Sequence, residues 1–378
     1  MPHLLFVVDD DSYFCSHRLH VGRAARKAGY DVSVATRVAR HRSQIEQEGF
    51  TLYPMKLRRG FRSPLDDLSA LFELIRLYRQ IRPDIVHHVA LKMVLFGGLA
   101  ARLTQTQARV HAITGLGHLF HADSFRNKVI RAVLTPFLRW ALAPPRSQVL
   151  LQNEDDAQDL LRAGLITEGQ TVIIRGAGVD TDQFRPSQEP PNDPVAILPA
   201  RIIKEKGVTE FVEAARLLKQ KGVRLTCVLV GDLDDLNPSG LTQGQVLRWI
   251  EEGVVECWGH RDDMEQVYAS SHMVVLPSYH EGLPKVLLEG AACGRPLIAT
   301  RIRGCQEVVR EGETGLLVPP RNAVALADAL LTLSQDRALR LQMGARGREI
   351  AVREFGQGRI AAETLAVYRQ VQAPCAVS

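Results

Sequence analysis

The sequence lacks the features of a secreted or membrane-spanning protein. Its six cysteines are scattered without any Cys-x-x-Cys pair, and Cys227 and Cys257 fall in strand-like runs, where reduced thiols act as small apolar residues. The apolar run Leu4–Val8 meets three aspartates at once, and the run Met93–Leu103 is too short to cross a bilayer. We therefore expect a cytoplasmic protein with no membrane span.

The sequence also lacks the glycine pattern of a dinucleotide-binding fold. A G-x-G-x-x-G loop would follow the first strand, but Asp9–Phe14 stands there instead, so nicotinamide binding is disfavoured. Three adjacent acids before a helix are more typical of helix caps and solvated charge than of a metal site. Internal repeats with a fixed period and low-complexity tracts are missing as well.

What is present is a regular alternation of β-branched runs and amphipathic helical stretches, which is typical of parallel α/β sheets. The length of 378 residues favours two domains, and the apolar share of 46% with 24% charged residues is that of a globular protein. Each half contains its own series of strands. The expected strands are Leu4–Val8, Asp31–Ala35, Ile85–Val89, Val110–Thr114, Val149–Gln152, Val172–Arg175, Val195–Pro199, Leu225–Gly231, Val254–Trp258, Met273–Pro277, Leu297–Thr300 and Gly315–Val318.

The proline-rich segment Asp180–Pro194 has no periodicity and is interpreted as an interdomain linker. We therefore predict an N-terminal domain over residues 1–186 and a C-terminal domain over residues 187–354. The tail is expected to be helical, and the helix at about residues 355–378 is a candidate to pack back on the first domain.

The strongest chemical signal is the segment Pro277–Pro284, which follows a buried strand and opens a helix. Ligands of parallel sheets bind at the carboxyl ends of strands, where Gly282 lets backbone approach a ligand and the free amides of the helix attract anions. Glu281 lies in this loop, and Glu289 lies among apolar helical residues, where an acid needs a partner. Such acids suit the vicinal hydroxyls of a ribose or hexose, although a solvated loop acid and an exposed helical acid are the alternative.

A second signal, Arg201–Gly207, follows the first strand of the same domain and precedes an amphipathic helix. Arg201 and Lys206 are therefore expected at the same edge of the sheet as Glu281. Two fixed cations there would neutralise a diphosphate and stabilise the charge that grows on it when a leaving group departs. Surface cations on a helix-entry turn are the alternative interpretation.

These motifs, together with Gly231-Asp232 and Gly259, resemble the donor-binding half of the retaining family 4 glycosyltransferases over nearly all of residues 195–320. The resemblance implies a GT-B fold, in which two Rossmann-like domains with parallel sheets face each other across a cleft. It also implies a nucleotide-diphosphate sugar, usually UDP-linked, and retaining transfer without a metal or other cofactor. The implied roles are diphosphate binding by Arg201 and Lys206, ribose binding by Glu289, and contacts to the donor sugar by Glu281, Gly282 and Leu283, with Pro284 and Gly231 also at the donor site.

Further segments of the sequence resemble those of the bacterial subgroup that extends polyprenyl-diphosphate-linked sugars. They include Pro83–His87, Lys92 and Thr114–Gly117 in the first half. Many relatives have His-Gly where this chain has Thr114-Gly115, so the role of that histidine cannot be transferred. The candidate acceptor-side residues are therefore Thr114, His118, Lys92 and His17, and the neighbouring histidines His87 and His88 are weighed with them.

Basic residues gather in the first half of the chain. The helical segment Phe125–Trp140 interleaves bases with large apolar residues, and the loop Arg58–Arg62 combines arginines with Phe61, so an anionic inner-membrane surface is a candidate partner. A buried helix with a basic solvent face is the alternative, and no nucleic-acid-binding motif is present. The favoured function is transfer of a sugar, a hexose or N-acetylhexosamine, to a lipid-linked or other glycan acceptor in surface polysaccharide assembly. A sugar-nucleotide epimerase or hydrolase of the same fold and a non-catalytic membrane-binding protein are the alternatives.

Overall fold

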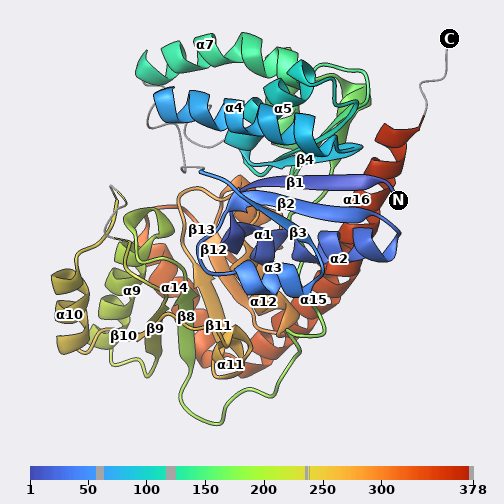
Figure 1. Ribbon diagram of the computed structural model, residues 1–378. Coiled ribbons are helices and arrows are strands. Elements are labelled where there is room, and N and C mark those ends of the chain that lie inside the picture. Colours follow the sequence, from blue (N-terminus) through green and yellow to red (C-terminus); the bar gives the residue numbers. More distant parts are fainter. Residues whose placement is uncertain (57–63, 116–124, 235–236, 238, 374–378) are drawn as a thin grey trace. The chain divides into compact units, whose positions relative to one another are not determined.

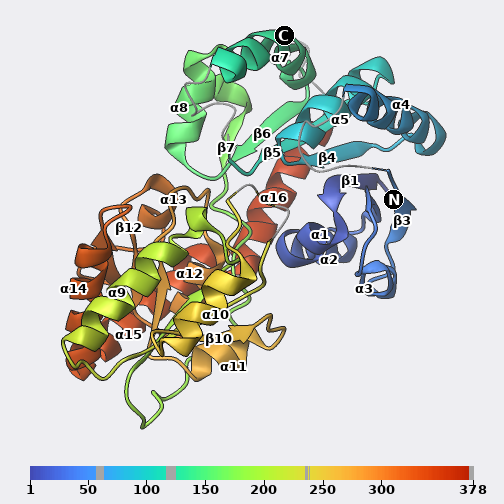
Figure 2. The same cartoon turned by 90° about the vertical axis from the view of Figure 1, so that its left-hand side faces the viewer.

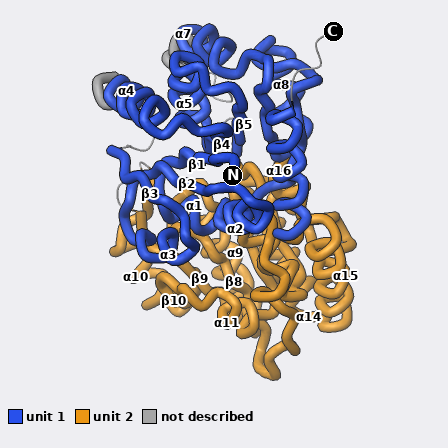
Figure 3. The backbone as a smooth tube through the Cα atoms, turned by 45° about the vertical axis from the view of Figure 1, so that its right-hand side comes forward, with its two compact units in different colours: residues 1–177, 357–378 blue, residues 178–356 orange. Residues whose placement is uncertain are grey.

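The chain folds into two units, coloured separately in Figure 3. The computed structural model describes residues 1–56, 64–115, 125–234, 237 and 239–373. Unit 1 contains residues 1–177 and the C-terminal helix α16 (Gln357–Gln372), and unit 2 contains residues 178–356. The division falls at Ala177 rather than at residue 186, because the expected linker packs into unit 2. The buried Phe184 ring lies 5.8 Å from that of Tyr268, and the Val179 N–H donates to the Phe355 carbonyl.

Unit 1 is built on a seven-stranded parallel sheet of order β3-β2-β1-β4-β5-β6-β7. Its strands are β1 (His3–Asp10), β2 (Asp31–Arg37), β3 (Thr51–Pro54), β4 (Ile85–Val89), β5 (Ala108–Ile113), β6 (Ser147–Leu151) and β7 (Thr171–Ile173). The sequence predicted all of them except β3. That strand has four residues at the sheet edge, none of them buried, so no apolar run marks it.

Helices cover both faces of this sheet, as Figures 1 and 2 show. One face carries α1 (Asp11–His17), α2 (Leu19–Lys27) and α16, whose apolar residues share one core cluster with the strands. The other face carries α4 (Pro64–Ile81), α5 (Leu91–Leu103), α7 (Phe125–Leu142) and α8 (Glu154–Arg162). The short helices α3 (Arg42–Gln47) and η1 (Glu168–Gln170) complete the unit.

Unit 2 has a six-stranded parallel sheet of order β10-β9-β8-β11-β12-β13. All six strands were expected from the sequence: β8 (Val195–Pro199), β9 (Thr226–Val230), β10 (Glu256–Gly259), β11 (Met273–Leu276), β12 (Leu297–Thr300) and β13 (Gly315–Val318). The chain order reverses between β8 and β11, which lie side by side in the middle of the sheet. In open α/β sheets, ligands bind outside the carboxyl ends of the strands at such a reversal.

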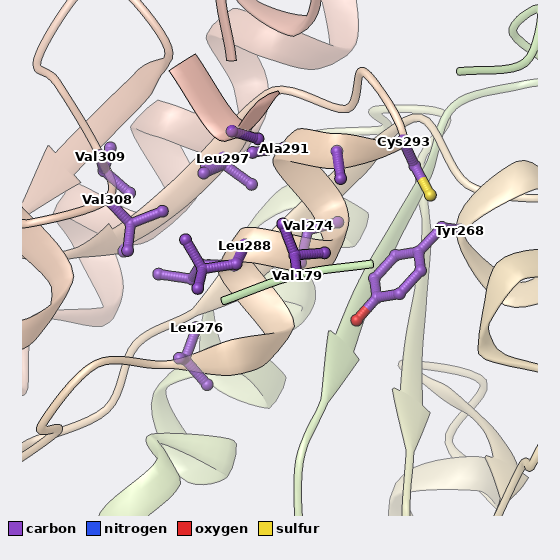
Figure 4. Close-up of a cluster of buried hydrophobic side chains, with 14 of the residues drawn as sticks. Val179, Tyr268, Val274, Leu276, Leu288, Ala291, Cys293, Leu297, Val308 and Val309 are labelled. Carbon is purple, nitrogen blue, oxygen red and sulfur yellow. The ribbon is translucent and has the colours of Figure 1, made fainter. Parts of the chain in front are cut away.

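The helices of unit 2 pack on both faces of its sheet. They are η2 (Lys204–Lys206), α9 (Val208–Gln220), α10 (Gln243–Glu251), α11 (Met264–Ala269), α12 (Lys285–Ala292), α13 (Arg303–Gln306), α14 (Ala323–Gln335) and α15 (Arg337–Phe355). Figure 4 shows the cluster in which Leu288 and Ala291 of α12 pack over Val274 and Leu297 of the strands. This packing fixes α12, and with it the one acid that the helix carries, against the sheet.

Candidate active site

Two loops meet where β8 and β11 end. The loop after β8 contains η2 and leads through Gly207 into α9, and the loop after β11 leads through Pro284 into α12. Gly207 has a φ of +71°, and a Cβ added there would lie 2.1 Å from the Pro277 carbonyl oxygen. The Tyr279 N–H donates to the Glu205 carbonyl at 2.9 Å. Glycine and this hydrogen bond therefore hold the two loops in direct contact.

The contact brings Lys206 and Glu281 together. Lys206 Nζ lies 2.5 Å from Glu281 Oε1, and the two side chains are 23% and 12% exposed. An ion pair that is largely withdrawn from water is screened less than a surface pair, but both groups remain reachable from solvent. Each group can therefore exchange its partner for a charged or hydroxyl-bearing ligand at this edge.

Arg201 lies at the same edge but pairs with a different loop. Its Nη1 donates to Asp234 Oδ2 at 2.6 Å, and the Arg201 side chain is about half exposed, at 48%. The Ile202 N–H donates to the Asp232 carbonyl, which holds the loop after β9 beside the loop after β8. The pairing of Arg201 with Asp234 depends on the register between strands, which no local sequence pattern reveals.

Glu289 is buried in α12 with two partners. It is 6% exposed, accepts a hydrogen bond from the Tyr268 hydroxyl at 2.8 Å on Oε2, and pairs with Lys285 Nζ at 3.1 Å through Oε1. Figure 4 shows the Tyr268 ring extending from the end of α11 into the cluster beneath α12. The partner expected for this buried acid is therefore Tyr268, which donates a hydrogen bond, and Lys285 one turn earlier adds an ion pair.

The glycines of the site have steric reasons. Gly231 has a φ of +145°, and a Cβ there would lie 2.1 Å from the Ala200 carbonyl oxygen. The backbones at the ends of β8 and β9 therefore come too close for any residue but glycine at this position. A Cβ on Gly304 would lie 2.3 Å from the Glu281 carbonyl oxygen and 2.5 Å from that of Gly282. Helix α13 thus supports the loop that carries Glu281.

The loop after β11 is fixed at further points. The Thr300 hydroxyl donates to the Ser278 carbonyl at 2.5 Å, and the Tyr279 hydroxyl donates to Glu210 Oε1 at 2.7 Å. Pro284 caps α12 with an extended backbone (φ −75°, ψ 110°), and the helix begins at Lys285. Leu283 packs against the same apolar cluster as Leu288. The backbone of residues 278–284 is therefore held in place before any ligand binds.

The acceptor-side candidates are spread over several elements of unit 1. Lys92 lies in the first turn of α5 and is 5% exposed, Thr114 directly follows β5, and His17 ends α1, where its ring stacks on Tyr13 at 4.1 Å. His118 lies outside the described residues, as do the loop Arg58–Arg62 and the side chains of α7 up to residue 130. The acceptor assignments stay predictions.

His87 and His88 do not fit the role weighed for them. Both are fully buried in β4: His87 Nδ1 is 2.6 Å from the Tyr368 hydroxyl, and His88 Nε2 is 2.8 Å from that of Tyr78. His88 Nδ1 also lies 3.1 Å from His111 Nδ1 on β5. Burial lowers the pKa of His88 to about 3 and holds the pKa of His87 and His111 well below their usual value. These neutral rings therefore belong to the core.

Two further observations concern membranes and metals. Within the described residues, no helix combines the length and the apolar character that a membrane crossing needs. Over the same residues, no three side chains of histidine, cysteine, aspartate or glutamate gather in a way that could hold a metal ion.

Comparison with known proteins gives matches in both units. Residues 3–153 match the family model described as glycosyl transferase 4-like, and residues 193–336 match that of glycosyl transferases group 1. The chain is 26% identical over 367 residues to the N,N'-diacetylbacillosaminyl-diphospho-undecaprenol alpha-1,3-N-acetylgalactosaminyltransferase of Campylobacter jejuni, covering 94% of this chain and 95% of the relative.

Two other matches are informative. The UDP-Gal:alpha-D-GlcNAc-diphosphoundecaprenol alpha-1,3-galactosyltransferase of Escherichia coli is 24% identical and covers 74% of this chain and 73% of its own length. The crystal structure of HepE from Anabaena in complex with UDP superimposes with a TM-score of 0.77 at 19% identity, covering 98% of this chain and all of that chain.

The two parallel sheets and the superposition on the HepE structure confirm the GT-B fold. Together the two family models match most of the chain, one in each unit. The protein therefore belongs to the GT-B glycosyltransferases with a 4-like N-terminal domain and a group 1 C-terminal domain.

Proposed function

We propose that this glycosyltransferase moves a hexose or N-acetylhexosamine, with retention of configuration, from a UDP-sugar to a polyprenyl-diphosphate-linked glycan. The observation that carries the proposal is the group of charged side chains at the reversal point of the unit 2 sheet, where Lys206 pairs with Glu281 and Arg201 pairs with Asp234. The Campylobacter and Escherichia relatives, by their names, act on sugars linked to undecaprenyl diphosphate, and the HepE structure holds UDP. These relatives support the substrate classes.

In this proposal the donor displaces the carboxylates that pair with Arg201 and Lys206 in the ligand-free protein. The diphosphate takes Arg201 from Asp234 and Lys206 from Glu281, which frees the Glu281 carboxylate to accept hydrogen bonds from sugar hydroxyls. The ribose hydroxyls donate to Glu289, whose carboxylate Tyr268 and Lys285 hold in place. One guanidinium group and one ammonium group supply the stabilisation that a divalent cation would otherwise give, so we propose that no metal is required.

The transfer step breaks the bond between the anomeric carbon and the β-phosphate oxygen. The same face of that carbon forms its new bond to the acceptor hydroxyl oxygen, and the hydroxyl proton passes to the departing β-phosphate. Arg201 and Lys206 stabilise the charge on the leaving diphosphate, and the fixed backbone of residues 278–284 orients the sugar. No protein nucleophile takes part in this step.

We further propose that unit 1 binds the lipid-linked acceptor and rests on the cytoplasmic face of the inner membrane. Helix α7 exposes Val133, Phe137 and Trp140, which follow one helical face, and α4 exposes Leu68 and Phe72. Helices α4 and α7 both pack against α5 (Figures 1 and 2). Exposed apolar and aromatic side chains on helices suit an interfacial contact. Phe137→Ser should weaken sedimentation with anionic vesicles, whereas the exposed Leu247→Ser in unit 2 should not.

The proposed transfer is tested with purified protein, a panel of UDP-, GDP- and ADP-sugars, and short-chain polyprenyl-diphosphate-linked sugars in EDTA. We expect one donor to add a single sugar mass to the acceptor, matched by release of UDP. Release of UDP with an altered free sugar and no acceptor would instead indicate an epimerase or hydrolase. Consumption of a donor only after a divalent cation is restored would contradict the metal-free proposal.

A further inference from the structure

A polar cavity lies in unit 1, at the edge of its sheet opposite to the carboxyl ends of the strands. Its volume is about 840 Å³, and its walls are the ends of α4 and α5 and the residues that lead into β4, β5 and β6. Cavities of about 300–1,000 Å³ are typical of small-molecule sites. Because Lys92 and Thr114 lie on the carboxyl side of β4 and β5, this cavity is separate from the predicted acceptor residues.

The cavity carries an excess of positive charge. Three arginines line it: Arg79, Arg82 and Arg146. Within the described residues, no carboxylate forms an ion pair with Arg79 or Arg82, and Arg146 donates at 2.6 Å to the neutral amide of Gln107. Among the described residues of the lining, Asp84 is the single acid, and one of its oxygens accepts a hydrogen bond from the backbone N–H of His3 at 2.7 Å. Guanidinium groups without carboxylate partners are suited to bidentate binding of phosphate.

The backbone of the same wall adopts a conformation that disfavours side chains. Six helices of the described chain, α2, α3, α8, α9, α10 and α12, are followed by a glycine with positive φ: Gly29, Gly49, Gly164, Gly222, Gly253 and Gly294. Helices α4 and α5 are instead followed by Arg82 (φ +45°) and Gln105 (φ +60°), and Arg146 also has a positive φ of +54°. Glycine is the residue that this conformation favours.

Three of the five non-glycine residues with positive φ in the described chain therefore line one cavity. Strained backbone positions cluster at ligand sites, where the side chain serves a purpose that glycine cannot. Arginine at the end of a helix also interacts favourably with the helix dipole, and that explains Arg79 in the last turn of α4. It does not explain why Gln105, a neutral residue, occupies the glycine position after α5.

We propose that this cavity binds a soluble ligand through a phosphate or diphosphate group, as a site separate from the donor site of unit 2. Arg79, Arg82 and Arg146 hold the phosphoryl oxygens, and Gln105 and Thr106 supply neutral hydrogen-bonding groups beside them. The lining is mainly polar, which fits a soluble phosphate ester better than a lipid.

The test uses inorganic pyrophosphate as the probe and isothermal titration as the readout. Because the unit 2 edge is proposed to bind a diphosphate as well, the titrations use the full-length Arg201→Ala/Lys206→Ala variant as background. We expect this background variant to bind pyrophosphate saturably, and the binding to weaken at least tenfold when Arg82→Gly is added. The Tm of the ligand-free protein should be unchanged or raised, because glycine relieves the backbone strain. Gln105→Gly should likewise keep or raise Tm and weaken binding several-fold.

Arg76→Ala is the matched control, since it removes the same charge from α4 one turn before Arg79, outside the cavity lining. We expect it to leave pyrophosphate binding within twofold, while Arg79→Ala weakens it. If the background variant binds pyrophosphate equally well with and without Arg82→Gly, the proposal is overturned. It is also overturned if the background variant does not bind pyrophosphate and Arg82→Gly lowers Tm. A second titration uses phosphatidylglycerol vesicles: association lost in Arg82→Gly, without pyrophosphate binding, would assign the phosphate to a lipid headgroup.

Discussion

The two sheets carry their polar groups in different places. In unit 2, charged pairs that join neighbouring loops lie at the carboxyl edge of the sheet, such as Lys206 with Glu281. In unit 1 the polar rings of His87, His88 and His111 lie inside the strands and are fully buried. Side chains at a strand's end remain reachable by a ligand, whereas those within a covered sheet serve packing. This contrast supports the proposal that unit 2 binds the donor, and it explains why histidines near strand ends are poor guides to function in unit 1.

The largest expected effect tests the edge of unit 2. Lys206→Ala and Glu281→Ala should each lower kcat by about 10²–10³-fold, since each removes a charged group from the reacting end of the donor. Far-UV circular dichroism and Tm should stay close to those of the parent, because both side chains lie at a loop edge. His88→Ala in unit 1 is the contrasting variant, with loss of stability as its main effect. Transfer rates within twofold of the parent for both edge variants would contradict the assignment.

The buried histidines of unit 1 predict acid lability. Their folded-state pKa lies below the unfolded value, so the unfolded chain binds more protons as the pH falls below about 6.5, and stability falls with it. Between pH 7 and pH 5, each such histidine should lower the free energy of unfolding by about 2 kcal/mol. Urea titrations at both pH values measure this loss. His111→Gln should flatten the pH dependence, and an unchanged slope would show that these rings do not govern it.

The support of Glu289 should appear in donor binding rather than in turnover. Tyr268→Phe removes one hydrogen bond of the carboxylate and leaves Lys285, so we expect the donor KM to rise about tenfold with kcat little changed. The preference for UDP over 2'-deoxy-UDP should narrow at the same time. Tyr279→Phe is the control: it removes a hydroxyl that donates to Glu210, and it should keep the preference for UDP. If Glu289→Ala keeps the full preference as well, the ribose assignment is wrong.

The smallest effect concerns the resting pair of Arg201. Asp234→Asn removes the charge that competes with the donor diphosphate for this arginine, so UDP should bind about two- to fivefold more tightly. Glu311→Gln is a matched control, since it breaks the exposed pair with Arg301 elsewhere in unit 2. Weaker UDP binding in Asp234→Asn would mean that the aspartate positions Arg201 rather than competing for it.

The sequence was sufficient for the parts of the site that follow directly from strand ends. Arg201, Lys206 and Glu281 follow two strands of one parallel sheet, so their common edge could be predicted, and the ion pair between Lys206 and Glu281 agrees with it. Glu289 could be expected to need a partner because its helical neighbours are apolar. The identity of that partner, Tyr268, could not be predicted, since it comes from another helix and depends on how α11 and α12 pack.

Other features lie beyond sequence patterns for similar reasons. The strand β3 has no buried residue, and the expected linker joins unit 2 through Phe184, whose burial depends on Tyr268. His87 and His88 were weighed as candidates because they stand near the end of a strand. Their burial follows from α16, which supplies Tyr368 from the far end of the chain, and from α4, which supplies Tyr78. Tertiary contacts of this kind decide which polar residues are core and which are site.

The most direct test of the central claim is calorimetric titration of UDP in EDTA. We predict that the parent protein binds UDP without a metal and that Arg201→Ala and Lys206→Ala each weaken this binding at least tenfold, since each removes a charged partner of the diphosphate. Equal affinity in the parent and both variants would contradict the claim that the charged edge of unit 2 holds the donor.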